Sequence, residues 1–400
     1  MSATEPMPAE QIRAAASLGF VFGVRMYGLF LVLPVIAILG AEMPGATAIT
    51  VGLAVGAYGL TQALLQIPLG LAADRWGRHR VIMAGLLVFI AGSVVAAMAE
   101  SIWVVIAGRA LQGCGAIAAA VMALLADSTS EHHRSKAMAL LGIGVGGSFL
   151  LALMTGPLLV GPLGLSGLFW LTAVLGGVAL ALVPKLPAPA GPRTPGAQPS
   201  RLPEVLRNKY LLRLDLGMLV LHAVLTSIFV AVPPLLQSEF GMPAASHWQV
   251  YLPVLLVSVI AMAPVLVIAS RRERQHWLPP IGMAVLAVAL AGLAFTGGAA
   301  WLLLLVLFFT AFNLMEASMP AQVSRKAPEM ARATALGVFS TSQFAGAFLG
   351  GSLGGVLAHF WGESSVFIAG AAVALICAVL VTPPAERAAT AFPGERKTLD

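Results

Sequence analysis

Residues 51–96, VGLAVGAYGLTQALLQIPLGLAADRWGRHRVIMAGLLVFIAGSVVA, decide the fold of this chain. They cover most of two apolar runs, 50–72 and 81–99, which lie on either side of one short basic turn. Each run has about 20 residues, the length that a helix needs to cross the hydrocarbon core of a bilayer. The segment therefore predicts a pair of antiparallel transmembrane helices.

The whole chain has the composition of a membrane protein. Of its 400 residues, 59% are hydrophobic and 10% are charged, whereas soluble globular chains carry roughly 25% charged residues. These values exclude a water-soluble enzyme, a disordered protein and a coiled coil. The two cysteines, Cys114 and Cys377, lie inside apolar runs, so no disulfide framework is predicted.

Twelve such runs occur along the chain, so we predict an all-α membrane protein with twelve transmembrane helices. A connection rich in Pro, Gly and Ala divides the runs into six and six, which predicts two six-helix bundles joined by a linker. The predicted parts are an N-terminal bundle (1–183), a cytoplasmic linker (184–209), a C-terminal bundle (210–382) and a cytoplasmic tail (383–400). The predicted spans are 16–39, 50–72, 81–99, 102–126, 136–160, 165–183, 210–236, 248–269, 278–297, 300–322, 332–358 and 365–382.

Basic residues mark one side of the membrane. The connections that follow the odd-numbered spans contain no Lys or Arg, and every basic residue other than Arg25 and Arg109 belongs to the opposite side. The positive-inside rule then predicts an inner-membrane protein with both termini in the cytoplasm. Because the basic residues are spread over many turns, they form no nucleic-acid-binding face, and we expect no nucleic-acid partner.

Two short motifs match enzyme signatures, but we interpret both as helix-packing glycines. Residues 142–147 match GxGxxG, yet a dinucleotide site needs a preceding strand. Residues 350–354 match GxSxG, yet the nearest base, His359, lies about 10 Å along a helix from Ser352. The sequence contains no zinc or P-loop pattern. We predict a protein that is not an enzyme, with no metal or cofactor.

Four ionisable residues lie inside predicted helices, where each is costly unless it faces a polar or wet interior. They are Arg25, Arg109, His222 and Glu316, in the first, fourth, seventh and tenth spans. Four helices spaced by three, each with one such group, predict a central cavity that these helices line.

Polar neighbours extend this set. Asn313 precedes Glu316 by one helical turn, and Gln112 follows Arg109 by three residues, so the members of each pair share a helix face. A polar stripe beginning at Tyr58 runs along the second span. The candidate substrate- and proton-binding residues are Arg25, Tyr58, Gln62, Arg109, Gln112, His222, Asn313 and Glu316.

Structural roles compete with these functional ones. The arginines can pair with backbone carbonyls, and His222 can be a neutral, hydrogen-bonded packing residue. Asp215 lies near the end of the seventh span, and we expect its carboxylate to reach the interface. For Glu316 we favour function. Loss of hydration favours its protonated form, whereas a nearby cationic group favours the ionised form, so a proton and a substrate can exchange at one site.

The connection 73–80 contains more than topology signals. Gly77 can take a positive φ at little cost, and Asp74 can accept hydrogen bonds and pair with Arg78. Topology explains the arginines of this turn, but it does not explain the Asp, the Gly or their spacing.

With these residues in view, the sequence resembles the major facilitator superfamily across essentially all of its membrane portion. The matching motifs lie in the turn after helix 2, in helix 4 and in helix 5. They are Gly70 with Asp74-Arg75-x-Gly77-Arg78, Arg109-x-x-Gln112-Gly113, and Gly156-Pro157.

The resemblance implies a drug:proton antiporter whose two bundles rock around a central site. It also implies that Asp74, Arg78 and Asp127 form a charge cluster that holds the bundles together on the cytoplasmic side. Ala152 and Val160 depart from the helix 5 signature, which usually has glycine at these positions. A related branch carries a soluble domain after the last helix. Here only residues 383–400 follow, so we expect the function of that domain to be missing.

We therefore predict a monomeric secondary transporter that exports a small organic solute in exchange for protons. Two alternatives stay open, a proton-coupled uptake symporter of the same fold and a membrane sensor or scaffold that does not transport. The sequence leaves the substrate open among anions, zwitterions and amphiphiles.

Overall fold

The computed structural model describes residues 6–186 and 198–383, and these fold almost entirely into helices. The described residues form fourteen α-helices and no β-strand, which confirms the predicted all-α class. Residues 187–197 of the predicted linker and 384–400 of the predicted tail lie outside the described residues. The α-helices are α1 (Ala9–Leu31), α2 (Leu33–Leu39), α3 (Ala48–Trp76), α4 (Arg78–Ala97), α5 (Ile102–Cys114), α6 (Ala118–Asp127), α7 (Glu131–Leu182), α8 (Leu202–Arg207), α9 (Lys209–Ser238), α10 (Trp248–Arg271), α11 (Leu278–Phe295), α12 (Gly298–Lys326), α13 (Arg332–Trp361) and α14 (Glu363–Val381).

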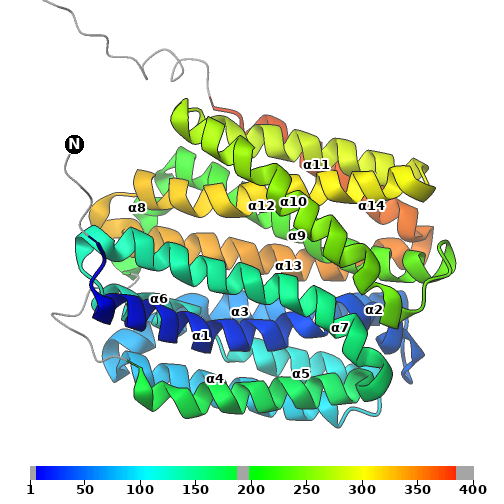
Figure 1. The fold of residues 1–400 in the computed structure, drawn as a ribbon, viewed down its shortest axis with the longest axis horizontal. Helices are drawn as coiled ribbons and strands as arrows, with labels where there is room; N and C mark the ends of the chain where they lie inside the picture. The colour runs from blue at the N-terminus through cyan, green and yellow to red at the C-terminus, as the bar shows by residue number, and fades with distance from the viewer. Residues whose placement is uncertain (1–5, 187–197, 384–400) are drawn as a thin grey trace, which may run out of the picture.

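Long apolar helices account for the predicted membrane spans. Eleven helical stretches are long and apolar enough to cross a bilayer, and one of them, His132–Lys185, has 54 residues. A straight helix of that length would be about 80 Å long, more than twice the thickness of the hydrocarbon core. Gly164 divides it, because its backbone (φ 62°, ψ −175°) is not helical. Figure 1 shows α7 turning back on itself at the right-hand end of the view. The two arms are the fifth and sixth spans, so the total of twelve is confirmed.

Several predicted helix boundaries are wrong. The first span is broken at Val32 into α1 and α2, and the fourth is broken at 115–117 into α5 and α6. The predicted connection 73–80 is almost entirely helical, because Gly77 alone separates α3 from α4. Its φ of 96° confirms the expected positive φ, a conformation that glycine adopts without strain. An apolar run indicates that its residues are buried in lipid, but it does not indicate whether the backbone hydrogen bonds continue along one helix. Hydropathy therefore does not reveal such breaks.

The connections gather at two opposite ends of the molecule. At one end the Ile102 N–H donates to Pro44 O (3.2 Å), and Ser166 Oγ donates to Ala97 O (2.5 Å). We call this the acidic end, and we call the opposite end, where the arginine-rich turns lie, the basic end. The acidic end carries Glu42, Glu100, Glu239 and Glu363, and the basic end carries Arg75, Arg78, Arg80, Arg271 and Arg272.

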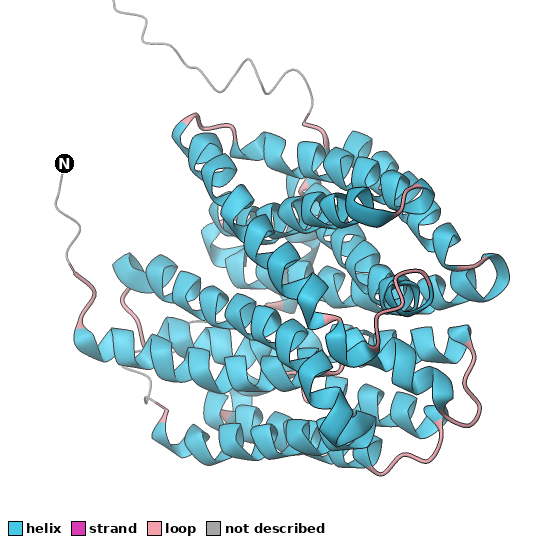
Figure 2. Ribbon diagram, turned by 45° about the vertical axis from the view of Figure 1, so that its right-hand side comes forward, coloured by secondary structure: helices cyan, strands magenta, loops and turns pink. Residues whose placement is uncertain are grey.

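Two groups of helices pack side by side, as Figure 2 shows in its lower and upper halves. We call α1–α7 the N-bundle and α9–α14 the C-bundle. One large apolar core lies within the C-bundle and includes Phe308, Phe309 and Phe367. A second core lies within the N-bundle and includes Ile82 and Phe89. Each bundle therefore buries its own apolar side chains.

The bundles meet backbone to backbone in their acidic halves. A Cβ placed on Gly351 of α13 would lie 2.7 Å from both Gly52 O and Gly56 N of α3. A Cβ placed on Gly355 would lie 2.5 Å from Ala48 O. Val230 of α9 also joins an apolar cluster with residues of α2. This end of the interface is closed so tightly that a single methyl group does not fit.

Toward the basic end, α7 leaves the C-bundle. Phe149 and Leu153 of α7 still pack with the C-bundle core. Before Phe149 in the same helix, toward the basic end, a Cβ on Gly142, Gly146 or Gly147 would meet nothing within 4 Å. The structure is therefore closed at the acidic end, with the glycine-rich face of α7 uncovered toward the basic end.

Candidate functional site

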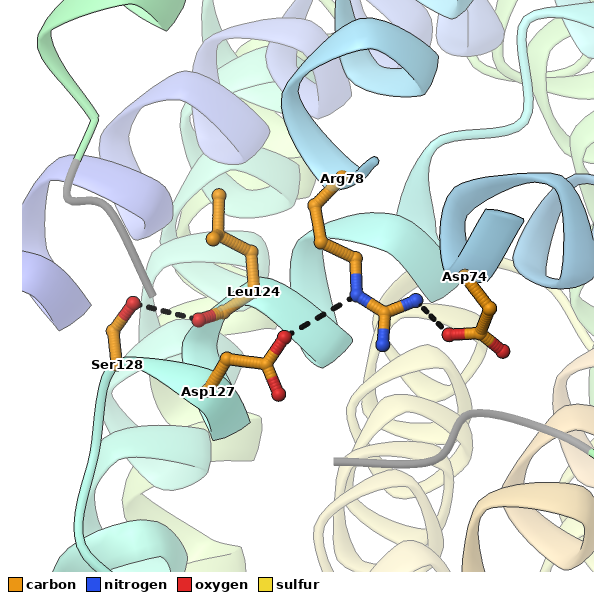
Figure 3. Close-up of polar contacts among 5 residues, drawn as sticks. All are labelled: Asp74, Arg78, Leu124, Asp127 and Ser128. Atoms are coloured by element: carbon orange, nitrogen blue, oxygen red, sulfur yellow. Dashed lines mark hydrogen bonds and ion pairs between the residues drawn. The ribbon is translucent and has the colours of Figure 1, made fainter. Parts of the chain in front are cut away.

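A charge cluster occupies the basic end of the N-bundle, where α3, α4 and α6 meet. Figure 3 shows the Arg78 guanidinium between the carboxylates of Asp74 and Asp127. Arg78, at the start of α4, pairs with Asp74 near the end of α3, and its Nε lies 3.4 Å from Asp127 Oδ2. Arg78 and Asp127 are buried (3% and 6% exposed), whereas the Asp74 side chain is 28% exposed. The three residues that the family resemblance groups together do form one cluster. All three belong to the N-bundle, so a role in holding the two bundles together stays a prediction.

Glycines of the same signatures lie at close helix contacts. A Cβ on Gly70 would lie 3.2 Å from the Ala119 side chain, so this position keeps α3 close to α6. Gly156 packs on the carbonyl of Leu31, at the break between α1 and α2, and Pro157 beside it is buried. Arg75 is exposed at the end of α3.

Arg25 lies in the interior of the N-bundle and is 0% exposed. Its guanidinium donates to Gly115 O (2.9 Å) and to Gln62 Oε1 (3.4 Å) and lies over the Phe89 ring. Gly115 belongs to the break between α5 and α6, where helical carbonyls lose their partners. Arg25 therefore satisfies a helix end, which matches the structural interpretation of this residue.

Arg109 is 2% exposed and is bound in a similar way. Its Nε donates to Ala54 O (3.3 Å), and its Nη1 donates to Gln112 Oε1 (2.9 Å), so the predicted pairing with Gln112 is present. The Gln112 amide in turn donates to Ser93 Oγ (2.8 Å). Tyr58 lies between the two arginines, with the guanidinium carbons of Arg25 and Arg109 at 5.9 and 5.4 Å from its ring centroid.

A second polar group lies in the C-bundle. His222 Nε2 of α9 is 3.7 Å from Glu316 Oε2 of α12. The side-chain amide of Gln343 of α13 contacts both residues. Gln343 Nε2 is 2.9 Å from His222 Nε2 and donates to Glu316 Oε1 at 3.3 Å. His222 Nδ1 is 3.3 Å from Met218 O. These distances fit a neutral His222 that donates through Nδ1 and accepts through Nε2.

Glu316 is the most accessible of the four predicted interior groups. Its side chain is 37% exposed, whereas Arg25, Arg109 and His222 are at most 9% exposed as residues. Its Oε2 is enclosed and accepts no hydrogen bond within the described residues. A carboxyl side chain that is partly accessible, and whose enclosed oxygen lacks a donor, can take up a proton or interact with a cationic group of a solute.

One expectation about the interior polar residues is wrong. Asn313, one turn from Glu316, donates its amide to Ser258 Oγ of α10 (2.9 Å), while Glu316 contacts α9 and α13, so its role beside Glu316 stays a prediction. Asp215 does not reach the interface. It is 6% exposed, and both of its carboxylate oxygens are enclosed without a hydrogen-bond partner in the described part of the chain.

The four interior residues form two pairs and not one ring. Arg25 and Arg109 flank Tyr58 in the N-bundle, and His222 and Glu316 lie together in the C-bundle. The sequence analysis missed Gln343. A polar residue within the apolar eleventh span was the available signal, but a single Gln gives no direction toward a partner on another helix.

Comparisons with known proteins agree with this architecture. A family model described as Major Facilitator Superfamily matches residues 16–351 and 280–399. The inner membrane transport protein YajR of Escherichia coli (strain K12) is 44% identical over 375 residues, which cover 92% of this chain and 82% of the relative. The multidrug resistance protein MdtH of Yersinia enterocolitica is 26% identical over 330 residues, which cover 82% and 81%.

A solved structure shows the same fold. A bacterial homologue of the human lysosomal transporter Spinster, in an inward-facing and occupied conformation, matches with a TM-score of 0.75 at 15% identity. The match covers 97% of this chain and 98% of that one.

Proposed function

The chain belongs to the major facilitator superfamily and is a secondary transporter, and we propose that it exports a small organic solute in exchange for protons. The observation that carries this proposal is Glu316. It is an accessible carboxylate inside the membrane portion, and one of its oxygens lacks a hydrogen-bond donor. Deprived of bulk water, a carboxylate is neutralised either by a proton or by a cationic partner, and the two compete.

The same geometry limits the chemical class of the solute. The guanidinium groups of Arg25 and Arg109 are buried and bound to carbonyl and amide oxygens, so they are not available to a solute in this conformation. The available ionisable group is a carboxylate, and the ring centroid of Phe312 lies 5.7 Å from that of its neighbour His222. We propose a solute with a cationic or hydrogen-bond-donating group attached to an apolar body. The 26% identical relative MdtH is named a multidrug resistance protein, and this supports export.

The charge of the connections supports an orientation in the membrane. The positive-inside rule places the basic end and both termini in the cytoplasm of an inner-membrane protein. We propose that the structure, closed at its acidic end, is an inward-facing state. We further propose that the protein acts as a monomer without a cofactor, with the proton gradient as its energy source. We also propose that the Asp74, Arg78 and Asp127 cluster stabilises closure of the basic end.

Glu316→Gln tests the proton-coupling role. A thermal-stability screen on the purified protein first identifies a solute, from cationic, zwitterionic and anionic amphiphiles. In proteoliposomes with an imposed pH gradient, the Gln variant should lose gradient-driven transport but keep exchange of solute across equilibrated membranes. Glu363→Gln, the same substitution at the acidic end, is the matched control and should transport as the wild type does.

The outcomes also separate the alternatives. Accumulation of solute on the side to which protons flow would indicate an uptake symporter and contradict export. If no ligand raises the melting temperature and no solute is transported, a sensor or scaffold is favoured. Gradient-driven transport that survives in Glu316→Gln shows that the coupling proton binds elsewhere.

A further inference from the structure

His247 is a fully buried histidine at the acidic end, in the connection between α9 and α10. Its residue exposure is 0%, and Nε2 lies 3.0 Å from Met242 O. Nδ1 is enclosed and has no hydrogen-bond partner in residues 6–186 and 198–383. Because a carbonyl oxygen can only accept, Nε2 carries the proton and Nδ1 is the bare acceptor of a neutral ring.

This ring lies at one end of a row of aromatic side chains that joins the two bundles. Successive ring centroids are separated by 6.2 Å (His247–Tyr251), 6.3 Å (Tyr251–Phe229) and 6.4 Å (Phe229–Phe149). Phe149 belongs to α7 of the N-bundle, whereas the other three belong to the C-bundle. Beside His247, the short 3-10 helix Ala244–Ser246 packs on α7, and Ala244 contacts an apolar cluster that contains residues of α2 and α7. His247 is therefore part of the closed acidic end.

Protonation of His247 is incompatible with this packing. A second proton would place an N–H donor and a positive charge in an enclosed site without an acceptor, which costs free energy. Opening of the acidic end would expose the connection to water and remove that cost. The closed state must therefore bind this proton more weakly than the open state does, and a lower pH must favour the open state.

We propose that His247 is a proton-sensitive switch that opens the acidic end when the solution on that side becomes acidic. The proposal concerns the conformational equilibrium and holds whether or not the solute proposed above is correct. In an antiporter, such a switch would expose the site on the side where protons are abundant.

Few other titratable groups near His247 could produce the same pH dependence of the open-to-closed ratio. α7, which packs against α10 and against residues 244–246, has none between Lys136 and Lys185. The groups nearest in the chain are Tyr251 on α10 and the exposed Glu239 in the same connection. α12, the other helix that packs on α10, carries Glu316 toward its middle. Glu316 is therefore the group from which the test must distinguish His247.

Distances across the acidic end, measured by double electron–electron resonance on the full chain in lipid nanodiscs, test the proposal. Spin labels are placed at Glu100→Cys and Ser364→Cys, one exposed position in each bundle, after Cys114 and Cys377 are replaced by Ser. The long-distance population should grow as the pH falls from 8 to 5. A single group changes the open-to-closed ratio by at most about tenfold for each pH unit.

Two variants and one measurement on the unaltered ring decide the outcome. His247→Gln and His247→Phe should match the wild type at pH 8 and lose most of the pH response, whereas Glu316→Gln should keep most of it. Because either His247 variant can disturb packing, ¹⁵N-labelled histidine in the wild type provides an independent test. The His247 signal should move to that of imidazolium over the same pH range in which the long distance grows. A pH response of wild-type size in both His247 variants, or imidazolium formation in a closed protein, overturns the proposal.

Discussion

Closure of the acidic end should be highly sensitive to Gly351→Ala. Gly351 faces α3, and an added Cβ would lie 2.7 Å from Gly52 O and from Gly56 N. Carbon atoms in favourable contact with other heavy atoms are separated by about 3.5–4.0 Å, so α3 and α13 must move apart by about 1 Å to accept one methyl group. Both contacts are with backbone atoms, which cannot move aside by changing a side-chain rotamer.

The expected effect is a shift of the conformational equilibrium and not a loss of folding. Inserting a methyl group into a tight interface costs about 1–3 kcal/mol, which lowers the closed-to-open ratio about 5- to 150-fold. Alanine also raises helix propensity by about 1 kcal/mol over glycine. That gain is shared by the closed and open states as long as α13 stays helical, so it stabilises the fold without offsetting the shift.

The spin-label pair at positions 100 and 364 measures this shift directly. Gly351→Ala should show a larger long-distance population than the wild type at pH 8, with an unchanged or higher melting temperature. Gly177→Ala is the matched control, because its added Cβ meets nothing within 4 Å. Equal distance distributions in Gly351→Ala and Gly177→Ala would refute the argument that glycine contacts hold this end closed.

Two further substitutions test the polar groups of the N-bundle. Arg109→Lys should lower the melting temperature and remove most transport, because one ammonium cannot reach both Ala54 O and Gln112 Oε1. A buried hydrogen bond that is left unmade costs about 1–3 kcal/mol. A fully active Lys variant would show that only the charge matters at this position. Asp74→Asn should reduce transport with near-normal expression and raise labelling of cysteines placed at the basic end, and because Asp74 is partly exposed the shift should not exceed about 1 kcal/mol; transport at the wild-type rate would exclude a role of this carboxylate in closure.

Hydropathy and charge placement predicted the number of spans and their class, because both signals depend only on the exchange between lipid and water. They did not predict the breaks at Val32 and Gly115. The hydropathy of a residue is the same whether its carbonyl accepts a hydrogen bond within the helix or, as at Gly115, from Arg25. Nor did they predict which end is closed. The open and closed states of a transporter bury similar side chains and differ by only a few kcal/mol.

Within the site, the sequence predicted which residues are buried and charged but not how they pair. The motif Asp74, Arg78 and Asp127 was predicted as a cluster because the family resemblance supplied the long-range contact. No such information existed for Gln343, whose partners Glu316 and His222 are 27 and 121 positions away. For Asp215, proximity to a helix end suggested access to water, but the packing of α9 in the C-bundle leaves it enclosed.

The distribution of these groups assigns different tasks to the two bundles. Arginine keeps its charge at any physiological pH, so Arg25 and Arg109 give the N-bundle interior a fixed positive charge. The polar interior of the C-bundle and its first connection instead carries carboxyl and imidazole side chains, which are Asp215, His222, His247 and Glu316. A fixed positive field on one side of the interface favours the deprotonated form of the groups on the other, which is the carboxylate of Asp and Glu and the neutral ring of His, and its strength depends on their separation. Rocking of the bundles changes that separation, so the movement that exposes the site to one side of the membrane also changes how tightly the C-bundle holds its protons.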